Sequence, residues 1–133
     1  MFTIRKTFHL SYGHRLHPYA GKCANLHGHN AVIAVTLQTG KLNAQGMVMD
    51  FNDLGAAVKK WLDATLDHKV LLSKDDPLLK TLRADGQDCF PVDGSPTAEK
   101  LAELIFDALK KQDLPVIEVS FRETETSLAS YRE

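Results

Sequence analysis

The alternation of apolar and polar residues from Thr3 to Tyr12 is the feature that most limits what this chain can fold into. Side chains that alternate with a period of two belong to a strand with one buried face. Pro18 and Gly21 interrupt the next stretch, which predicts a loop into a second strand from His27 to Gln38. The chain is therefore predicted to begin with an antiparallel pair of strands.

Two later segments have helical spacing. The first has capping side chains in Asp50–Asp53 and then an apolar stripe that runs to Thr65. The second is predicted to run from a Ser95-Pro96 cap to about Lys111, with Glu99 in its first turn. Between them, residues 73–94 are rich in Asp, Gly and Pro, which predicts an irregular excursion.

Alternation returns from Val116 to Glu123, and Ser127 to Tyr131 is expected to form a final edge strand. The order strand, strand, helix, helix, strand, strand predicts an α+β domain with helices on one face of an antiparallel sheet. A chain of 133 residues suits a single domain over 1–133.

Composition limits the partners. The formal net charge is -1, so no basic field is present to attract nucleic acid or an anionic membrane. No apolar run is long enough to span a bilayer, and the N-terminus lacks the apolar core of a signal peptide. Two cysteines are too few for a disulfide framework, so a soluble protein of the reducing cytoplasm is expected.

The segment His27-Gly28-His29 places two imidazoles on the same side of a strand. His14, at the end of the preceding strand, could supply a third nitrogen from next door. Three protein nitrogens leave one position open, which is typical of a catalytic zinc site. By itself the spacing of His27 and His29 is also compatible with two ordinary surface histidines.

Cys23 lies four residues before His27 in a loop that also contains Lys22. Positive surroundings lower the pKa of a thiol, so Cys23 could act as a thiolate base beside the metal. It could also be a fourth metal ligand that closes the site, or a small buried hydrophobic residue. The residues alone leave the three roles open.

Asp67-His68 follows the first predicted helix. A carboxylate that orients an imidazole is a common acid and base unit, although Asp and His are also ordinary residues at helix ends. Glu123 ends a strand on its buried face, where a carboxylate needs a cation or a ligand with donor groups such as an amino-pyrimidinone ring. A solvated strand end is the alternative for Glu123.

Several segments together, in order along nearly the whole chain, resemble the 6-pyruvoyl-tetrahydropterin synthase and 6-carboxytetrahydropterin synthase family. These segments are Ser11-Tyr12-Gly13-His14-Arg15-Leu16, Cys23-x3-His27-Gly28-His29-Asn30, Gly46-Met47-Val48-Met49-Asp50-Phe51, Leu66-Asp67-His68, Pro96-Thr97-Ala98-Glu99 and Glu123-Thr124. The resemblance implies a tunnelling fold, in which a four-stranded antiparallel sheet with two helices joins its copies into a β-barrel. It further implies a homohexamer, built as a dimer of trimers, with active sites between subunits.

The resemblance also implies roles for individual residues. His14, His27 and His29 would hold Zn²⁺, and Cys23 would be the catalytic base. Asp67 and His68 would form a proton relay contributed by a neighbouring subunit. The pterin ring would be anchored by Glu123, with help from Thr97 and Thr124.

The implied substrate is 7,8-dihydroneopterin triphosphate, and two products are open. The three residues between Cys23 and His27 favour the branch that forms 6-carboxytetrahydropterin, acetaldehyde and triphosphate for queuosine synthesis. The runner-up is the pyruvoyl-forming synthase, and a further alternative is a non-catalytic protein that binds zinc or pterin. Tyr12-Gly13 departs from the family, since two alanines are common there. Arg15 and Lys22 are nearby candidates for the triphosphate.

Overall fold

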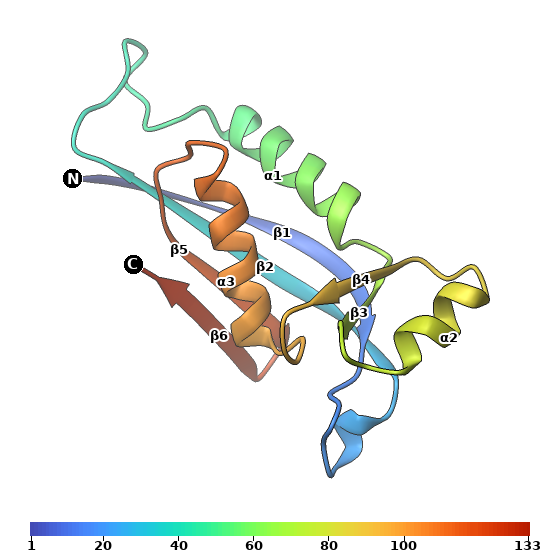
Figure 1. The fold of residues 1–133 in the computed structure, drawn as a ribbon. Helices are drawn as coiled ribbons and strands as arrows, with labels where there is room; N and C mark the ends of the chain where they lie inside the picture. Colours follow the sequence, from blue (N-terminus) through green and yellow to red (C-terminus); the bar gives the residue numbers. More distant parts are fainter.

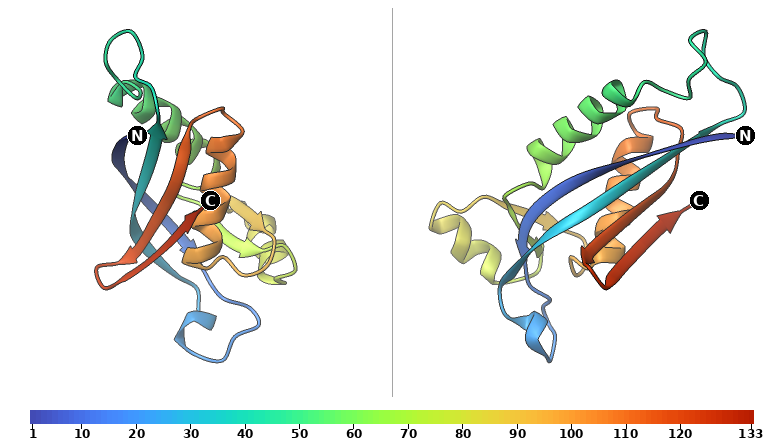
Figure 2. Two further views of the ribbon diagram at one scale, coloured as in Figure 1. Left: turned by 90° about the vertical axis from the view of Figure 1, so that its left-hand side faces the viewer. Right: turned by 180° about the vertical axis from the view of Figure 1, so that it is seen from behind.

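The computed structural model describes residues 1–133 and contains a six-stranded sheet with its two longer helices packed against one face (Figure 1; Figure 2). The strands are β1 (Phe2–His14), β2 (His27–Thr39), β3 (Val70–Ser73), β4 (Cys89–Val92), β5 (Val116–Thr124) and β6 (Ser127–Arg132). The helices are α1 (Phe51–Thr65), α2 (Leu78–Ala84) and α3 (Ala98–Lys110), and a short 3₁₀ turn covers Lys22–Ala24. None of the helices combines the length and the hydrophobicity needed to cross a membrane.

The hairpin of β1 and β2 confirms the predicted pair of strands. The two strands are paired antiparallel along their whole lengths. At the end of the hairpin His14 lies opposite His27, and Tyr12 lies opposite His29. Directly opposed residues of an antiparallel pair share a face of the sheet. The hairpin therefore brings three imidazoles to one end of its buried face.

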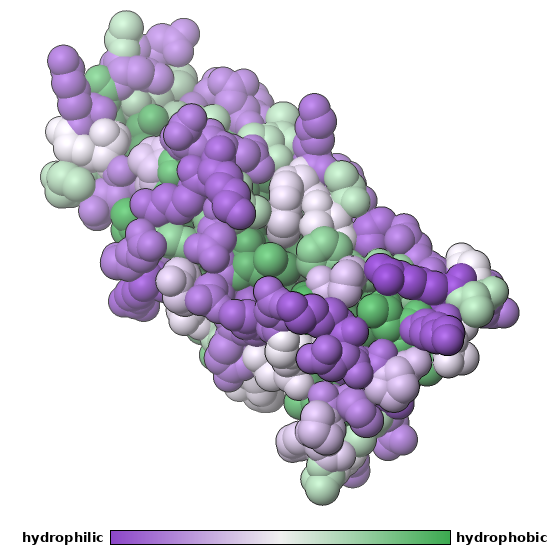
Figure 3. Space-filling model, in the orientation of Figure 1, coloured by the Kyte–Doolittle hydropathy of each residue, from purple (hydrophilic) through white to green (hydrophobic).

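The two longer helices, α1 and α3, carry the predicted apolar stripes. Asp50 caps α1, because its side chain accepts a hydrogen bond of 2.6 Å from the backbone N–H of Asn52. The predicted cap of α3 is wrong: Thr97, two residues after Ser95, accepts from the backbone N–H of Lys100. Both stripes pack into one hydrophobic core with the inner face of the sheet. On the surface of the molecule, hydrophilic side chains dominate the face drawn in Figure 3.

Residues 73–94 are more ordered than predicted. They contain α2 and β4, and β4 pairs parallel with β3, which itself pairs parallel with the end of β1. The sequence signal is weak because β3 and β4 have four residues each and α2 has seven. In addition, Leu71, Leu72 and Ser73 are all buried, so β3 shows no alternation.

The α+β class is confirmed, but the prediction of four antiparallel strands and two helices is wrong. The sheet has the order β4-β3-β1-β2-β5-β6, with a parallel part at β3 and β4, and three helices are present. The four strands that alternation predicted, β1, β2, β5 and β6, form its antiparallel part. The barrel built from several copies stays a prediction.

Candidate metal centre and active site

Three histidines converge where the β1 and β2 hairpin ends. One ligand nitrogen from each of His14, His27 and His29 can be chosen so that all three lie within 4.8 Å of one another. The Nε2 atoms of His14 and His27 are 3.1 Å apart. His14 is buried, whereas His27 and His29 are partly exposed. The cluster is therefore held by the protein on one side and accessible on the other.

Backbone carbonyls determine which nitrogens face the cluster. The Nδ1 of His14 is 2.9 Å from the carbonyl oxygen of Pro96, and the Nδ1 of His27 is 2.6 Å from that of Asn25. A carbonyl only accepts, so each Nδ1 carries the hydrogen and donates. When both rings are neutral, they present the lone pairs of Nε2 to each other. Such carbonyl partners are the usual outer support of a metal-binding histidine.

The residues present fit a divalent metal. Two lone pairs at 3.1 Å repel each other unless a cation lies between them. In a tetrahedral zinc site with Zn–N bonds of about 2.0–2.1 Å, two ligand nitrogens lie about 3.3 Å apart. Burial lowers the pKa of His14, which favours the neutral imidazole that a metal requires. The spacing of the two Nε2 atoms and the lowered pKa of His14 therefore both suit a divalent metal.

One cavity of about 410 Å³ joins most of the predicted site. Seven of the nine predicted residues line it, namely His14, Cys23, His27, His29, Thr97, Glu123 and Thr124. The cavity walls come from the ends of β1, β2 and β5, the start of α3, and β6. Residues from distant parts of the sequence thus meet in one hollow of a size suited to a small molecule.

Glu123 lies at the inner wall of this cavity. Its Oε1 accepts a hydrogen bond of 3.0 Å from the hydroxyl of Tyr12 and lies 3.5 Å from the Nε2 atoms of His14 and His29. Burial, together with the nearby carboxylate, raises the pKa of Tyr12, so the hydroxyl keeps its proton and donates. The alternation of β5 predicted a buried carboxylate with a partner; Glu123 is half-buried, and Tyr12 is the residue that donates to it.

Cys23 lies in the 3₁₀ turn of the loop between β1 and β2. Its thiol is free and partly exposed, and its backbone carbonyl accepts a hydrogen bond of 2.8 Å from the N–H of Leu16. The group of ligand atoms within 4.8 Å contains the histidines alone, without Cys23. This placement favours a thiol beside the metal centre over a fourth ligand.

Asp67 and His68 form a hydrogen-bonded pair at the end of α1. The Nδ1 of His68 is 2.6 Å from Asp67 Oδ2, and the other carboxylate oxygen accepts from the backbone N–H of Ser11 at 3.0 Å. Burial raises the pKa of Asp67, but the hydrogen bonds from Ser11 and His68 outweigh it and lower the pKa overall. An ionised Asp67 fixes the hydrogen of His68 on Nδ1 and leaves Nε2 as the exposed nitrogen.

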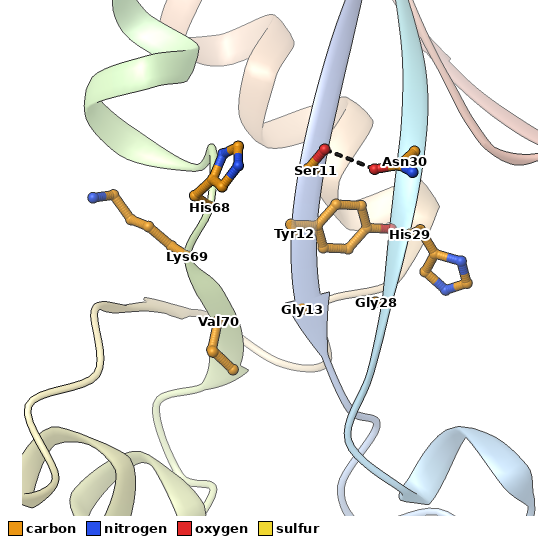
Figure 4. Close-up of a pocket in the computed structure, with 9 residues that line it drawn as sticks. All are labelled: Ser11, Tyr12, Gly13, Gly28, His29, Asn30, His68, Lys69 and Val70. Carbon is orange, nitrogen blue, oxygen red and sulfur yellow. Dashed lines mark hydrogen bonds between the residues drawn. The ribbon is translucent and has the colours of Figure 1, made fainter.

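The Asp67 and His68 pair does not share a cavity with Cys23. His68 lines a second hollow of about 390 Å³ together with Ser11, Lys69 and His29, and His29 is the one predicted site residue that borders both hollows. Figure 4 shows His68 beyond the outer edge of β1 and the His29 ring beyond β2, so the two histidines border this hollow from opposite sides of the hairpin. Within one chain the predicted relay and the predicted base are therefore apart.

Two features of the site have no clear sequence signal. Arg15, a candidate for the triphosphate, instead gives its guanidinium to Asp76, with Nε 2.8 Å from Oδ2. The carbonyl of Pro96 supports His14 across 82 positions of sequence.

Known proteins resemble this chain over nearly its whole length. Residues 3–133 match the family described as 6-pyruvoyl tetrahydropterin synthase. A 6-carboxy-5,6,7,8-tetrahydropterin synthase of Aquifex aeolicus is 34% identical over 158 aligned positions, which cover 98% of this chain and 97% of the relative. The protein of the same name from Haemophilus influenzae is 34% identical over 142 positions and all of both chains.

A solved structure agrees with the sequence relatives. The 6-pyruvoyl tetrahydropterin synthase of Caenorhabditis elegans superposes with a TM-score of 0.75 at 28% identity, over 99% of this chain and 95% of that one. The match to the family description extends over the histidine cluster, the Cys23 loop, the Asp67 and His68 pair and Glu123. This chain belongs to the 6-pyruvoyl tetrahydropterin synthase family.

Proposed function

We propose that this protein is a zinc-dependent lyase that converts 7,8-dihydroneopterin triphosphate and one water molecule to 6-carboxy-5,6,7,8-tetrahydropterin, acetaldehyde and triphosphate. The observation that carries the proposal is the convergence of His14, His27 and His29 in one cavity with Cys23 and Glu123. The names of the relatives from Aquifex aeolicus and Haemophilus influenzae support the product. The reaction would belong to the synthesis of queuosine and other 7-deazaguanines, in the cytoplasm.

The three histidines would hold the metal through nitrogens that face the cavity. When bound, Zn²⁺ would act as a Lewis acid that stabilises negative charge on the hydroxyl oxygens of the substrate side chain. Cys23 would remove a carbon-bound proton from that side chain, and its partial exposure at the cavity wall supports this access. A cation near the substrate stabilises the negative charge that develops when the proton leaves, so it makes that carbon-bound proton more acidic.

Glu123 would hold the pterin ring. An ionised carboxylate only accepts hydrogen bonds, and a pterin presents neighbouring N–H donors that one carboxylate can receive together. Thr97 and Thr124 line the same cavity and would add hydroxyl contacts. The Thr97 side chain already accepts from the backbone N–H of Lys100, so its hydroxyl hydrogen is free to donate to the substrate.

Asp67 and His68 would return protons to the reaction from a neighbouring subunit. Their separation from Cys23 within one chain supports this, because a relay must come within hydrogen-bond reach of its substrate. An active site shared between subunits requires assembly, which we propose to be a homohexamer formed by two trimers. The free edges at β6 and β4 are available for strands of other copies.

The runner-up activity is triphosphate elimination to 6-pyruvoyl-tetrahydropterin. The solved structure from Caenorhabditis elegans that bears this name supports it, since its fold matches over nearly the whole chain. The non-catalytic alternative requires Cys23 to close the metal site, and its absence from the cluster of ligand nitrogens speaks against that role.

The experiment is a turnover assay on the zinc-loaded protein with dihydroneopterin triphosphate. We expect triphosphate and acetaldehyde to appear together, only with metal present. Cys23→Ala should abolish release and retain zinc, while Cys89→Ala, which alters the other free cysteine, should leave both intact. Release that is unaffected by Cys23→Ala would refute the role of the thiol. No release from the parent protein would refute the proposed activity.

A further inference from the structure

The loop between β1 and β2 carries Cys23 but has almost no packing of its own. None of residues 15–26 is buried, and most of them are exposed. Its hydrogen bonds are largely internal, such as Leu16 N–H to the Cys23 carbonyl and Ala24 N–H to the Gly21 carbonyl. The loop projects from the end of the hairpin in Figure 1 and Figure 2. A loop of this kind needs an anchor on the body of the protein to hold a side chain in one place.

Arg15 supplies that anchor at the base of the loop. Its Nε donates to Asp76 Oδ2 at 2.8 Å and its Nη2 donates to Oδ1 at 2.5 Å. Apart from contacts with the two strands that it joins, this is the one hydrogen-bonded link between the loop and the rest of the chain. Paired bonds between a guanidinium and a carboxylate fix direction as well as distance.

Asp76 is rigidly placed for this contact. Its side chain has 0% exposure, its backbone N–H donates to the Ser73 carbonyl at 2.9 Å, and Oδ1 accepts from the N–H of Leu78 at 2.8 Å. The carboxylate thus lies between the end of β3 and the start of α2. A buried carboxylate is costly without a cation, so the fold strongly favours the arrangement that keeps Arg15 in place.

We propose that Asp76 is a positioning residue that holds the Cys23 loop through Arg15. The segment 73–94, which shows no role in its sequence pattern, would then serve to present one carboxylate to the base of this loop. The expected effect of Asp76 on turnover rests on the proposed role of Cys23 as the base. Its effect on the loop itself is independent of that role.

The test measures the reactivity of the Cys23 thiol and the exchange of the Leu16 amide. In a Cys89→Ala background, iodoacetamide reports Cys23 alone. Asp76→Asn removes the charge and keeps an acceptor for Leu78, and Arg15→Lys keeps the charge and removes the paired geometry. Both should speed alkylation and amide exchange by about threefold to tenfold, because the loop opens more often.

The matched control is Asp93→Asn. It breaks the exposed ion pair of Lys74 and Asp93, in which the two side chains are 62% and 78% exposed, within the same segment. We expect this variant to behave like the parent. If Asp76→Asn and Arg15→Lys also match the parent in alkylation and exchange, the anchoring role is overturned.

Turnover adds a second readout. Misplacing the base should lower kcat by about tenfold in Asp76→Asn, with KM and bound zinc nearly unchanged. A loop that opens without any loss of kcat would overturn the positioning role. If the parent shows no turnover, the proposed activity has failed, and the alkylation and exchange rates still decide whether Asp76 holds the loop.

Discussion

The hydroxyl of Tyr12 donates a hydrogen bond of 3.0 Å to the carboxylate of Glu123. The same ring packs edge-on against His14, with ring centroids 5.1 Å apart. One buried side chain on β1 therefore supports both the proposed ring anchor and a proposed metal ligand. An alanine at this position could do neither.

Tyr12→Phe should weaken substrate binding and spare the metal. Phenylalanine keeps the packing against His14 and removes only the hydrogen bond to Glu123. Without this bond the carboxylate is no longer held in the direction that would receive the ring, so KM should rise by about tenfold with zinc content unchanged. Steady-state kinetics and metal analysis on the same preparation measure both. Tyr131→Phe is the control, and equal KM values in the two variants would contradict the role of Tyr12.

Removing one histidine of the cluster should remove the metal. His27→Ala deletes a ligand whose Nε2 lies 3.1 Å from that of His14. Two remaining ligands bind zinc far more weakly, so the metal content after dialysis should fall well below one per chain. His9→Ala changes a histidine on the exposed face of β1 and should leave it unchanged. Mass spectrometry of the metal gives the answer, and full retention in His27→Ala would contradict the site.

The Asp76 ion pair should stabilise the fold above about pH 4 and lose its effect below. The hydrogen bond from Arg15 is the main cause that lowers the pKa of Asp76. A carboxyl whose folded pKa is depressed adds stability above its unfolded pKa of about 3.9, and this stability disappears as pH falls through the folded value. Asp76→Asn loses a hydrogen-bonded charge pair with Arg15 and should therefore cost about 2 kcal/mol at pH 7.

The check is chemical denaturation of both proteins from pH 7 to pH 3. The difference in free energy of unfolding should hold steady to about pH 5 and shrink toward zero in acid. Effects of the other carboxyls cancel, because both proteins carry them. A difference that stays constant over the whole range would show that Asp76 makes no charge-dependent contribution.

Mixing two inactive variants should restore activity. The Cys23→Ala subunit retains His68, and the His68→Ala subunit retains Cys23. If each site takes its base from one subunit and its relay from the next, random assembly gives about a quarter of sites with both residues intact. Co-expression followed by a turnover assay measures this. Activity no greater than that of the separate variants would place both residues in one subunit or exclude a role for one of them.

Sequence periodicity predicted the elements that are long enough to show it. The alternation of β1 and β2 predicted the hairpin, and the hairpin predicted that His14 would meet His27 and His29. The short elements β3, β4 and α2 were not predicted, because they are too short to show a period. The ion pair of Arg15 and Asp76 was not predicted for another reason. Their contact joins positions 61 residues apart through a charge pair, and no local pattern specifies which charges meet.

The product formed from 7,8-dihydroneopterin triphosphate by the zinc-loaded protein decides between the two possible reactions. We expect the mass of 6-carboxy-5,6,7,8-tetrahydropterin, with one acetaldehyde and one triphosphate for each turnover and no product after removal of the metal. The mass of 6-pyruvoyl-tetrahydropterin without acetaldehyde would contradict the proposed product, and unchanged substrate would contradict the proposed enzyme.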